Sequence, residues 1–310
     1  MPSFVVAASL AALICAQAGA GAPAPGRMPK LAPPRLWRPP AVKLVSAGEA
    51  PLAPLRYALV KGAQGALDLA ATGRWRVKTS NSEANTELPN LSTPFSYAVV
   101  SPGQFSFEFQ EATSKGAGSE NDNATQGIIS ALKGVRGSVE LDARGLAQKL
   151  SIMPSPLDAE FSQDSTRVTV GSHYALELAR SAFMHVLTPL PDEPIGIGGS
   201  WQVERPQTRG TVSFTEVATY TLVSRDAKGA KLTVRFGGKP DPLAGIHPNQ
   251  MELTVSGSGE TDLEFARPFP VRIDDQLLIH ALTGPKETHQ RVEHEGTVTG
   301  HLQLSTRKLP

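Results

Sequence analysis

Residues 231–236 read KLTVRF, and their alternation decides the class of fold. Leu232, Val234 and Phe236 are apolar, while the residues between them are charged or polar. Successive side chains of a strand point to opposite faces, so this period of two predicts a strand with one face buried and the other in water. Such strands are typical of an antiparallel sheet.

The same alternation recurs at MELTV, residues 251–255, and at TVTGHLQLS, residues 297–305. Turn residues lie between such segments, at Asp226–Gly229, at Gly257-Ser-Gly259 and at Ala143-Arg-Gly145. Glycine tolerates the positive φ of tight turns, and aspartate bonds to its own backbone. We therefore predict about a dozen strands joined mainly by hairpins.

Two segments have helical periodicity instead. Residues 172–187, SHYALELARSAFMHVL, place apolar side chains at i, i+3 and i+4, and Pro189 predicts that the helix ends before it. A weaker pattern covers residues 124–135, with Asp122 or Asn123 as its cap. The predicted fold class is α+β, with a mainly antiparallel sheet that is curved or forms a half-barrel.

Two short echoes predict that the chain contains two similar halves. Glycine and tryptophan beside a valine also mark ordinary strand starts, so chance similarity is the alternative. A true duplication would make Trp75 and Trp201 equivalent core anchors at the starts of their strands. The echoes are GRWRV (73–77) with GSWQV (199–203), and GSVELDARG (137–145) with GETDLEFAR (259–267).

The glycine-rich segment LPDEPIGIGGSWQV, residues 190–203, has some features of a phosphate loop. The third position of a G-x-G-x-x-G pattern is Trp201, however, and no lysine closes a P-loop. The segment also follows a predicted helix, whose C-terminal end repels anions, rather than preceding one. We interpret it as a turn into a buried strand that begins at Trp201.

The amino terminus predicts export. Residues 1–18 contain the apolar run FVVAASLAALICA, followed by small residues that suit signal-peptide cleavage. Residues 19–54 hold nine prolines and five Lys or Arg against one Glu, which predicts an extended basic linker. Residues 55–310 are predicted to form one β-rich domain, which the repeat would divide into 55–190 and 191–310.

Export places the protein in the periplasm or outside the cell, with no transmembrane span expected after signal removal. Cys15 is the only cysteine, and Ile14 before it does not fit a lipoprotein signal, so we do not expect anchoring through Cys15. The formal charge is only +1, without the basic patch that nucleic-acid binding requires. Neither a disulfide nor a cofactor is expected.

The proline-rich entry into a Gly-x-Trp strand, LPDEPIGIGGSW at 190–201, resembles the signature of an exported bacterial protein family of unknown function. The similarity extends over residues 55–306. The motif consists of residues suited to turns and packing. The resemblance therefore implies export and a β-rich fold, and it carries over no functional residues.

Catalytic and metal-binding patterns are sparse, and we predict no catalytic or metal-binding residue. His289 and His294 point to opposite faces of a strand, and His294 and His301 lie at positions typical of solvated histidines. His173 and His185 lie about 18 Å apart along the predicted helix, which is too far for one metal ion.

Other candidate sites also have simpler explanations. Asp274 and Asp275 are neighbours that point opposite ways in a strand, so a turn or strand-edge role is favoured over an acid-base pair. Residues 114–127, SKGAGSENDNATQG, lack the spacing of a calcium loop and are predicted to form a polar loop. No G-x-S-x-G or S-x-x-K motif indicates a serine nucleophile.

Two classes of function remain open. The first is a non-catalytic binding or scaffold module of the bacterial envelope, with the 172–187 helix over part of a concave sheet that holds a lipid, another apolar ligand or an envelope protein. The alternative is a periplasmic hydrolase that uses His289, His294 or the Asp274 region. A cleft with a histidine and a carboxylate within hydrogen-bond reach would favour the enzyme.

Overall fold

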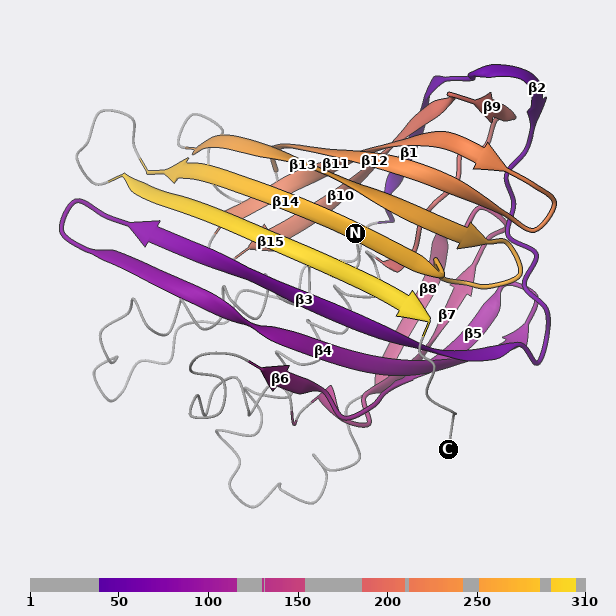
Figure 1. Cartoon of the computed structure of the whole chain (residues 1–310), viewed down its shortest axis with the longest axis horizontal. Helices are drawn as coiled ribbons and strands as arrows, with labels where there is room; N and C mark the ends of the chain where they lie inside the picture. The colour runs from indigo at the N-terminus through magenta and orange to yellow at the C-terminus, as the bar shows by residue number, and fades with distance from the viewer. Residues whose placement is uncertain are drawn as a thin grey trace.

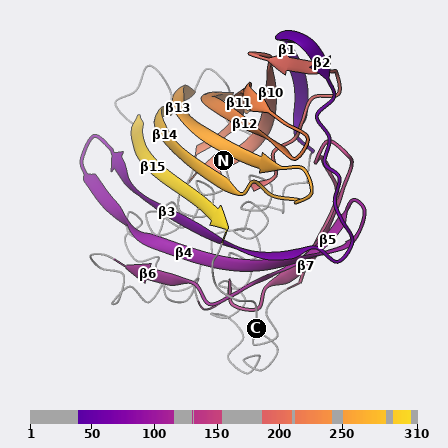
Figure 2. The same cartoon turned by 45° about the vertical axis from the view of Figure 1, so that its right-hand side comes forward.

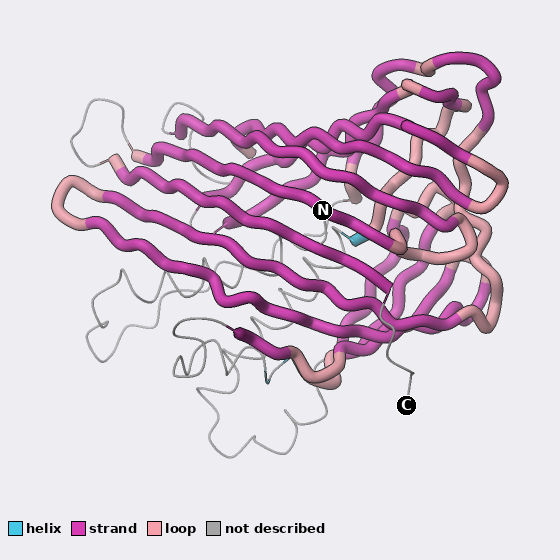
Figure 3. Tube along the Cα trace, in the orientation of Figure 1, coloured by secondary structure: helices cyan, strands magenta, loops and turns pink. Residues whose placement is uncertain are grey.

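The computed structural model describes residues 39–115, 130, 132–153, 186–209, 212–241, 251–284 and 291–304. These residues are mostly β-strand (Figures 1 and 3). In chain order the strands are β1 (Ala41–Ser46), β2 (Glu49–Ala53), β3 (Gln64–Lys78), β4 (Glu83–Ser101), β5 (Gln104–Phe109), β6 (Thr113–Lys115), β7 (Arg136–Leu141), β8 (Ala147–Met153), β9 (Ile195–Ile197), β10 (Ser200–Arg209), β11 (Val212–Arg225), β12 (Gly229–Pro240), β13 (Met251–Glu264), β14 (Arg272–Thr283) and β15 (Val292–Leu304).

One large antiparallel sheet contains thirteen of these strands. Its order is β1-β10-β11-β12-β13-β14-β15-β3-β4-β5-β7-β8, and β6 pairs with β4. Two meanders, β3 to β8 and β10 to β15, are thus joined where β15 pairs with β3. The sheet is not closed on itself, since β1 and β8 form its two edges, and Figure 2 shows that it curves. The predicted curved antiparallel sheet is therefore confirmed.

Alternation along the strands places the core on the concave face. In β12 the apolar residues at 232, 234 and 236 are buried, and the polar residues between them are exposed, as predicted from KLTVRF. MELTV lies in β13 and most of TVTGHLQLS lies in β15, with the same alternation. Each fully buried Val, Leu or Phe side chain contributes about 1.5–3 kcal/mol to stability, so this face provides most of the folding energy.

Glycines within the strands make room for large inward side chains. Trp75 of β3 lies directly opposite Gly296 of β15. A Cβ atom at Gly296 would lie 2.1 Å from two carbons of the Trp75 ring. The indole therefore occupies the space above the glycine, and Phe236 is placed similarly beside Gly257.

Phe269, in the turn after β13, packs against the first meander. Its ring lies edge-on to Phe105, with centroids 4.9 Å apart, and to Phe95 and Tyr97, each at 5.3 Å. Edge-to-face rings at such distances attract one another beyond their burial in the core. The cluster therefore ties the two meanders together away from the β15–β3 junction.

The segment before β9 is fixed by side chains from two other parts of the chain, Tyr57 and strand β10. Residues 187–189 lie in no helix or strand, and they are buried. Three buried donors then bind successive carbonyl oxygens: Arg205 Nη2 donates to Leu187 at 3.0 Å, the Tyr57 hydroxyl to Thr188 at 3.0 Å and Trp201 Nε1 to Pro189 at 2.9 Å.

The predicted linker over residues 19–54 is wrong at its C-terminal end. β1 pairs with β10, and β2 pairs with β9 in a separate two-stranded sheet. Val42 and Leu44 pack against the core from β1. Because β1 satisfies backbone groups that β10 would otherwise expose, the folded part includes residues from about Ala41.

The turn predictions have mixed outcomes. Asp226–Gly229 joins β11 to β12, with the Asp226 carboxylate accepting from the Lys228 and Gly229 amides. Ala143–Gly145 lies in the turn between β7 and β8, where Gly145 has a φ of +75°. The turn predicted at Gly257-Ser-Gly259 is wrong, because these residues lie inside β13, where both glycines face crowded neighbours on β14.

Several predicted features lie outside the described residues. Of the two predicted helices, only residues 186–187, 130 and 132–135 are described, and Ser130, Leu132 and Val186 are helical. The helical part of the α+β class therefore stays a prediction. The other features are the signal peptide at 1–18, most of the loop at 114–127, and His173, His185 and His289.

The two echoes map onto the meanders only in part. β7 and β13, which carry GSVEL and GETDLE, are each the fourth strand of their meander. Trp75 and Trp201 are both buried, as core anchors should be. However, Trp201 starts β10 whereas Trp75 lies near the end of β3, so its predicted place at a strand start is wrong. The duplication stays a prediction.

Candidate functional site

The concave face is apolar except for a group of buried polar side chains. We call five of them the inner polar cluster: Tyr57, Arg205, Glu216, Tyr220 and Asp275, all of which are buried. Arg205 of β10 lies opposite Glu216 of β11 in the register. Tyr220 stacks on Trp201, with centroids 5.5 Å apart.

Arg205 presents hydrogen-bond donors within this apolar surrounding. The residue is 2% exposed, and its Nη2 donates to the Leu187 carbonyl. Among the described residues, Nε and Nη1 are buried without a hydrogen-bond partner. A buried donor left unpaired costs about 1–3 kcal/mol. An oxygen atom of a bound ligand would offset that cost.

Burial also raises the pKa values of three members of the cluster, Tyr57, Tyr220 and Asp275. Burial, together with a smaller contribution from the Glu216 carboxylate, raises the pKa of Asp275 to about 7. A carboxyl group of this kind exchanges its proton near neutral pH. Burial likewise raises the pKa of Tyr57 and of Tyr220, while the Arg205 guanidinium acts against the rise at both. Both phenols therefore stay protonated and can donate hydrogen bonds.

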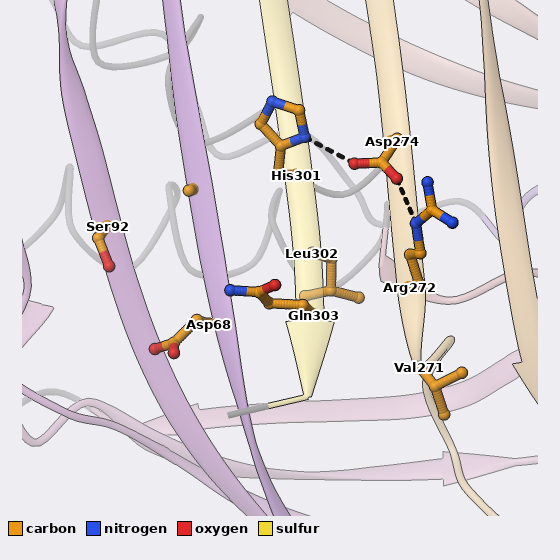
Figure 4. A pocket seen from close by; sticks show the side chains of 9 residues that line it. Asp68, Ser92, Val271, Arg272, Asp274, His301, Leu302 and Gln303 are labelled. Atoms are coloured by element: carbon orange, nitrogen blue, oxygen red, sulfur yellow. Dashed lines mark hydrogen bonds and ion pairs between the residues drawn. The ribbon is translucent and has the colours of Figure 1, made fainter. Parts of the chain in front are cut away.

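A second site lies on the outer face of the sheet. It is a solvent-open pocket of about 500 Å³ over β3, β4, β14 and β15, which we call the outer pocket (Figure 4). Its lining residues are Asp68, Ala70, Ser92, Val271, Arg272, Asp274, His301, Leu302 and Gln303.

One side of the outer pocket is a three-residue ionic chain. His301 Nδ1 lies 2.7 Å from Asp274 Oδ1, and Arg272 Nε binds the other oxygen of the same carboxylate (Figure 4). Burial opposes ionisation of Asp274, but these two partners prevail and hold its pKa below the usual range. Asp274 therefore stays ionised and orients the His301 ring.

The aspartates and histidines differ from their sequence predictions. Asp274 and Asp275 do point to opposite faces, but they lie in the middle of the sheet on β14, so the turn or edge role is wrong. His294 is 5% exposed rather than solvated, and its Nε2 lies 3.2 Å from the Thr283 hydroxyl. Burial lowers its pKa. His301 is 54% exposed and lies on the polar face, as predicted.

The glycine-rich segment forms the predicted turn into a buried strand. Gly198 has a φ of +75°, β10 begins at Ser200, and Trp201 is buried. The Gly198 amide donates to the Leu222 carbonyl and the Gly199 amide to that of Gly196. Because these N–H groups are used within the protein, they are not available to a phosphate.

In the part of the chain that the structure describes, no three His, Cys, Asp or Glu side chains are placed together to hold a metal ion. Nor does that part of the chain contain a helix with the length and apolar character needed to cross a membrane.

The inner polar cluster was not predicted from the sequence, although a signal for it was present. Each charged member occupies an inward position in an alternating strand, where an apolar residue is expected. Arg205 follows Trp201 and Val203, and Asp275 lies between Ile273 and Leu277. A charge at an inward position is costly, so it deserves a functional explanation.

The described residues thus define an open, curved antiparallel sheet with a polar cluster inside its concave face and a charged pocket on its outer face. Comparison of the sequence with known protein families and with curated proteins found no match to either. The geometry of these two sites is therefore what indicates a function for this protein.

Proposed function

We propose that this protein is an exported, non-catalytic binding module of the bacterial envelope that holds an apolar ligand against its concave face. The observation that carries the proposal is the inner polar cluster, which converges within an otherwise apolar curved surface. Ligand sites commonly combine an apolar concave lining with a few polar groups that orient the ligand. The ligand we favour has an apolar body and one oxygen-bearing polar end.

Arg205 is the group that selects this polar end. Its Nη2 serves the fold by holding Leu187, but this leaves the buried Nε and Nη1 atoms as unused donors among the described residues. Tyr220 beside it stays protonated and can also donate. A carboxyl, phosphate or carbonyl oxygen would accept from these groups, while Trp201 and its neighbours contact the apolar body.

Access to the cluster requires movement of the protein. All five side chains are buried in the structure, so a ligand reaches them only when part of the chain contacting the concave face is displaced. We expect ligand binding to change the environment of Trp201, because its ring stacks directly on Tyr220. Tryptophan fluorescence should therefore report binding.

We also propose that the protein is exported and belongs to the exported bacterial family that its sequence resembles. An apolar run with a small-residue cleavage site at residues 1–18 supports export to the periplasm or the exterior. The LPDEPIGIGGSW motif supports membership of the exported bacterial family that it resembles. A lipid or an envelope protein is then the partner most available to the binding face.

Mass spectrometry of an organic extract tests the binding proposal. The mature protein would be purified without detergent from the envelope of its native host, and a stoichiometric apolar molecule is the expected result. Arg205→Met should lose most of that molecule, whereas Arg235→Met, on the exposed face of β12, should retain it. Circular dichroism would confirm that both variants fold. An empty extract from the wild-type protein would refute the proposal.

One observation favours the hydrolase as a second candidate. Asp274 orients His301 through Nδ1, which leaves Nε2 as a general base. The cross-strand row continues from His301 through Ala70 to Ser92. At about 4.8 Å per strand, the Cα atoms of Ser92 and His301 are about 10 Å apart, so a direct proton transfer between them requires rearrangement.

The binding module remains the stronger candidate, because the hydrogen-bonded ladder uses the backbone N–H groups of these central strands and leaves none to form an oxyanion hole. A fluorophosphonate probe separates the two functions. We expect no labelling of Ser92 by peptide mass spectrometry. Labelling that disappears in His301→Ala would instead establish the hydrolase.

A further inference from the structure

The outer pocket contains a carboxylate whose partner is missing. Asp68 projects from β3 to the outer face, opposite Gln303 of β15 in the register. Its Oδ1 atom is buried, and no described residue forms a hydrogen bond with it. Figure 4 shows Asp68 across the pocket from the Asp274–Arg272 pair, with Gln303 between them. A carboxylate with a buried oxygen that lacks a donor is destabilising, and a cation in the pocket that Asp68 lines would offset that cost.

The opposite side of the pocket does not supply that donor. Arg272 binds Asp274 through Nε, and Asp274 also holds the Nδ1 atom of His301. The positive charge of Arg272 is therefore already directed at a carboxylate. Asp68 is the negative group of the pocket whose charge is left for a ligand.

The surrounding surface is acidic as well. Glu260 lies opposite Asp274, and Asp262 lies opposite Arg272, both on β13. Lys231 of β12 is the next residue beyond Asp262 in the same row. This surface therefore holds four carboxylates and two cationic side chains, so its net charge is negative when His301 is neutral. The carboxylates are those of Asp68, Glu260, Asp262 and Asp274, and the cations are Arg272 and Lys231.

We propose that the outer pocket binds an ammonium group, with Asp68 as its counter-ion. A compact ammonium has three donors, and the pocket offers the Asp68 oxygen, the Gln303 side-chain oxygen and the Ser92 hydroxyl as acceptors. A divalent metal fits less well, because the described residues place no three metal-ligating side chains together. An anion is disfavoured by the four carboxylates.

Two sources could supply this ammonium. One is a free amine, such as an amino sugar or a polyamine, which the pocket volume of about 500 Å³ would accommodate. The other is the lysine side chain of a protein partner. Both present the same charged group to Asp68, so the inference concerns that group and is independent of the ligand proposed for the concave face.

Titration of the full-length folded protein with small probes tests the inference. Cadaverine, glucosamine and Nα-acetyl-lysine amide carry the ammonium, while 1-pentanol and N-acetylglucosamine are neutral controls. Binding would be followed by calorimetry. Asp68→Asn keeps the shape of the side chain and removes its charge. Glu108→Gln removes a carboxylate from an exposed position on β5 and serves as the matched control. Thermal melts would verify that both variants fold.

We expect at least one ammonium probe to bind in the millimolar range or more tightly, and the neutral controls not to bind. Asp68→Asn should weaken that binding by about tenfold or more, and Glu108→Gln should leave it unchanged. Preference for glucosamine or cadaverine would indicate a free amine, and preference for the lysine derivative a protein side chain. Absence of binding by all three probes, or equal binding by Asp68→Asn, would overturn the inference.

Discussion

The Trp75–Gly296 pair allows a quantitative test of the junction between the two meanders. Replacing Gly296 with alanine adds one methyl group, which would lie 2.1 Å from two carbons of the indole ring. Carbon atoms in contact normally lie about 3.5–4.0 Å apart. Trp75 is 2% exposed, so it has little free space into which it can move.

The expected cost follows from this overlap. Inserting a methyl group into a packed core usually costs about 1–3 kcal/mol, and alanine regains about 0.5–1 kcal/mol over glycine through lower chain entropy. We therefore expect Gly296→Ala to lower the free energy of unfolding by about 1–2 kcal/mol. At Gly237 the nearest atom to an added Cβ is the Val217 carbonyl oxygen at 4.0 Å. Gly237→Ala should therefore be neutral or stabilising by up to about 1 kcal/mol.

Equilibrium urea denaturation, followed by circular dichroism, measures both changes. The clash is specific to the indole, so Gly296→Ala should cost much less when Trp75 has already been replaced with leucine. An equal cost in the two backgrounds would refute the reasoning. So would a Gly237→Ala variant that is as unstable as Gly296→Ala.

Three further predictions concern other parts of the structure. Burial raises the pKa of Asp275 from 3.8 to about 7, so between these values the folded protein retains a proton that the unfolded chain releases. The free energy of unfolding should therefore fall as the pH rises from about 4 to 7. Thermal melts at pH 4.5 and pH 8 should show a smaller fall in Asp275→Asn. A similar slope in the variant would contradict this assignment. Trp201→Phe removes the donor to the Pro189 carbonyl and part of a buried ring, and should cost about 2–4 kcal/mol in urea denaturation; a cost below about 1 kcal/mol would show that the bond is dispensable. Arg225 donates to the carbonyls of Pro51, Ala53 and Ile195, so Arg225→Met should speed amide hydrogen exchange in residues 49–53 with little change in melting temperature. Unchanged exchange there would show that strand pairing alone holds β2.

Strand type could be predicted from sequence because it depends on nearby residues. The alternation in KLTVRF, MELTV and TVTGHLQLS identifies strands in β12, β13 and β15. Prediction from nearby residues failed where glycines or prolines, which are typical of turns and linkers, lie within strands. Gly257 and Gly259 resemble a turn, yet they lie inside β13, where β14 comes too close to leave room for a Cβ atom. The proline content of residues 19–54 obscured the alternation of Val42 and Leu44 in β1.

The candidate sites were harder to predict than the strands. His294 lies between two glutamates, which predicts a solvated side chain, but the register places it on the buried face opposite Ala281 and Val77. The adjacent Asp274 and Asp275 favour a turn or strand edge, whereas the pairing of β14 with β13 and β15 places Asp275 in the middle of the sheet. In both cases the burial of the side chain depends on strands that are distant in the sequence.

The sequence by itself determined the antiparallel strands, the turns at Asp226–Gly229 and Ala143–Gly145, and the buried strand after the glycine-rich segment. The tertiary structure alone decided that β15 pairs with β3, which brings Asp68 to the same pocket as Asp274 and His301. It also decided that Arg205, Tyr220 and Asp275 share one concave face. Periodicity is set by residues a few positions apart, whereas the partner of a strand is chosen by the packing of the whole chain.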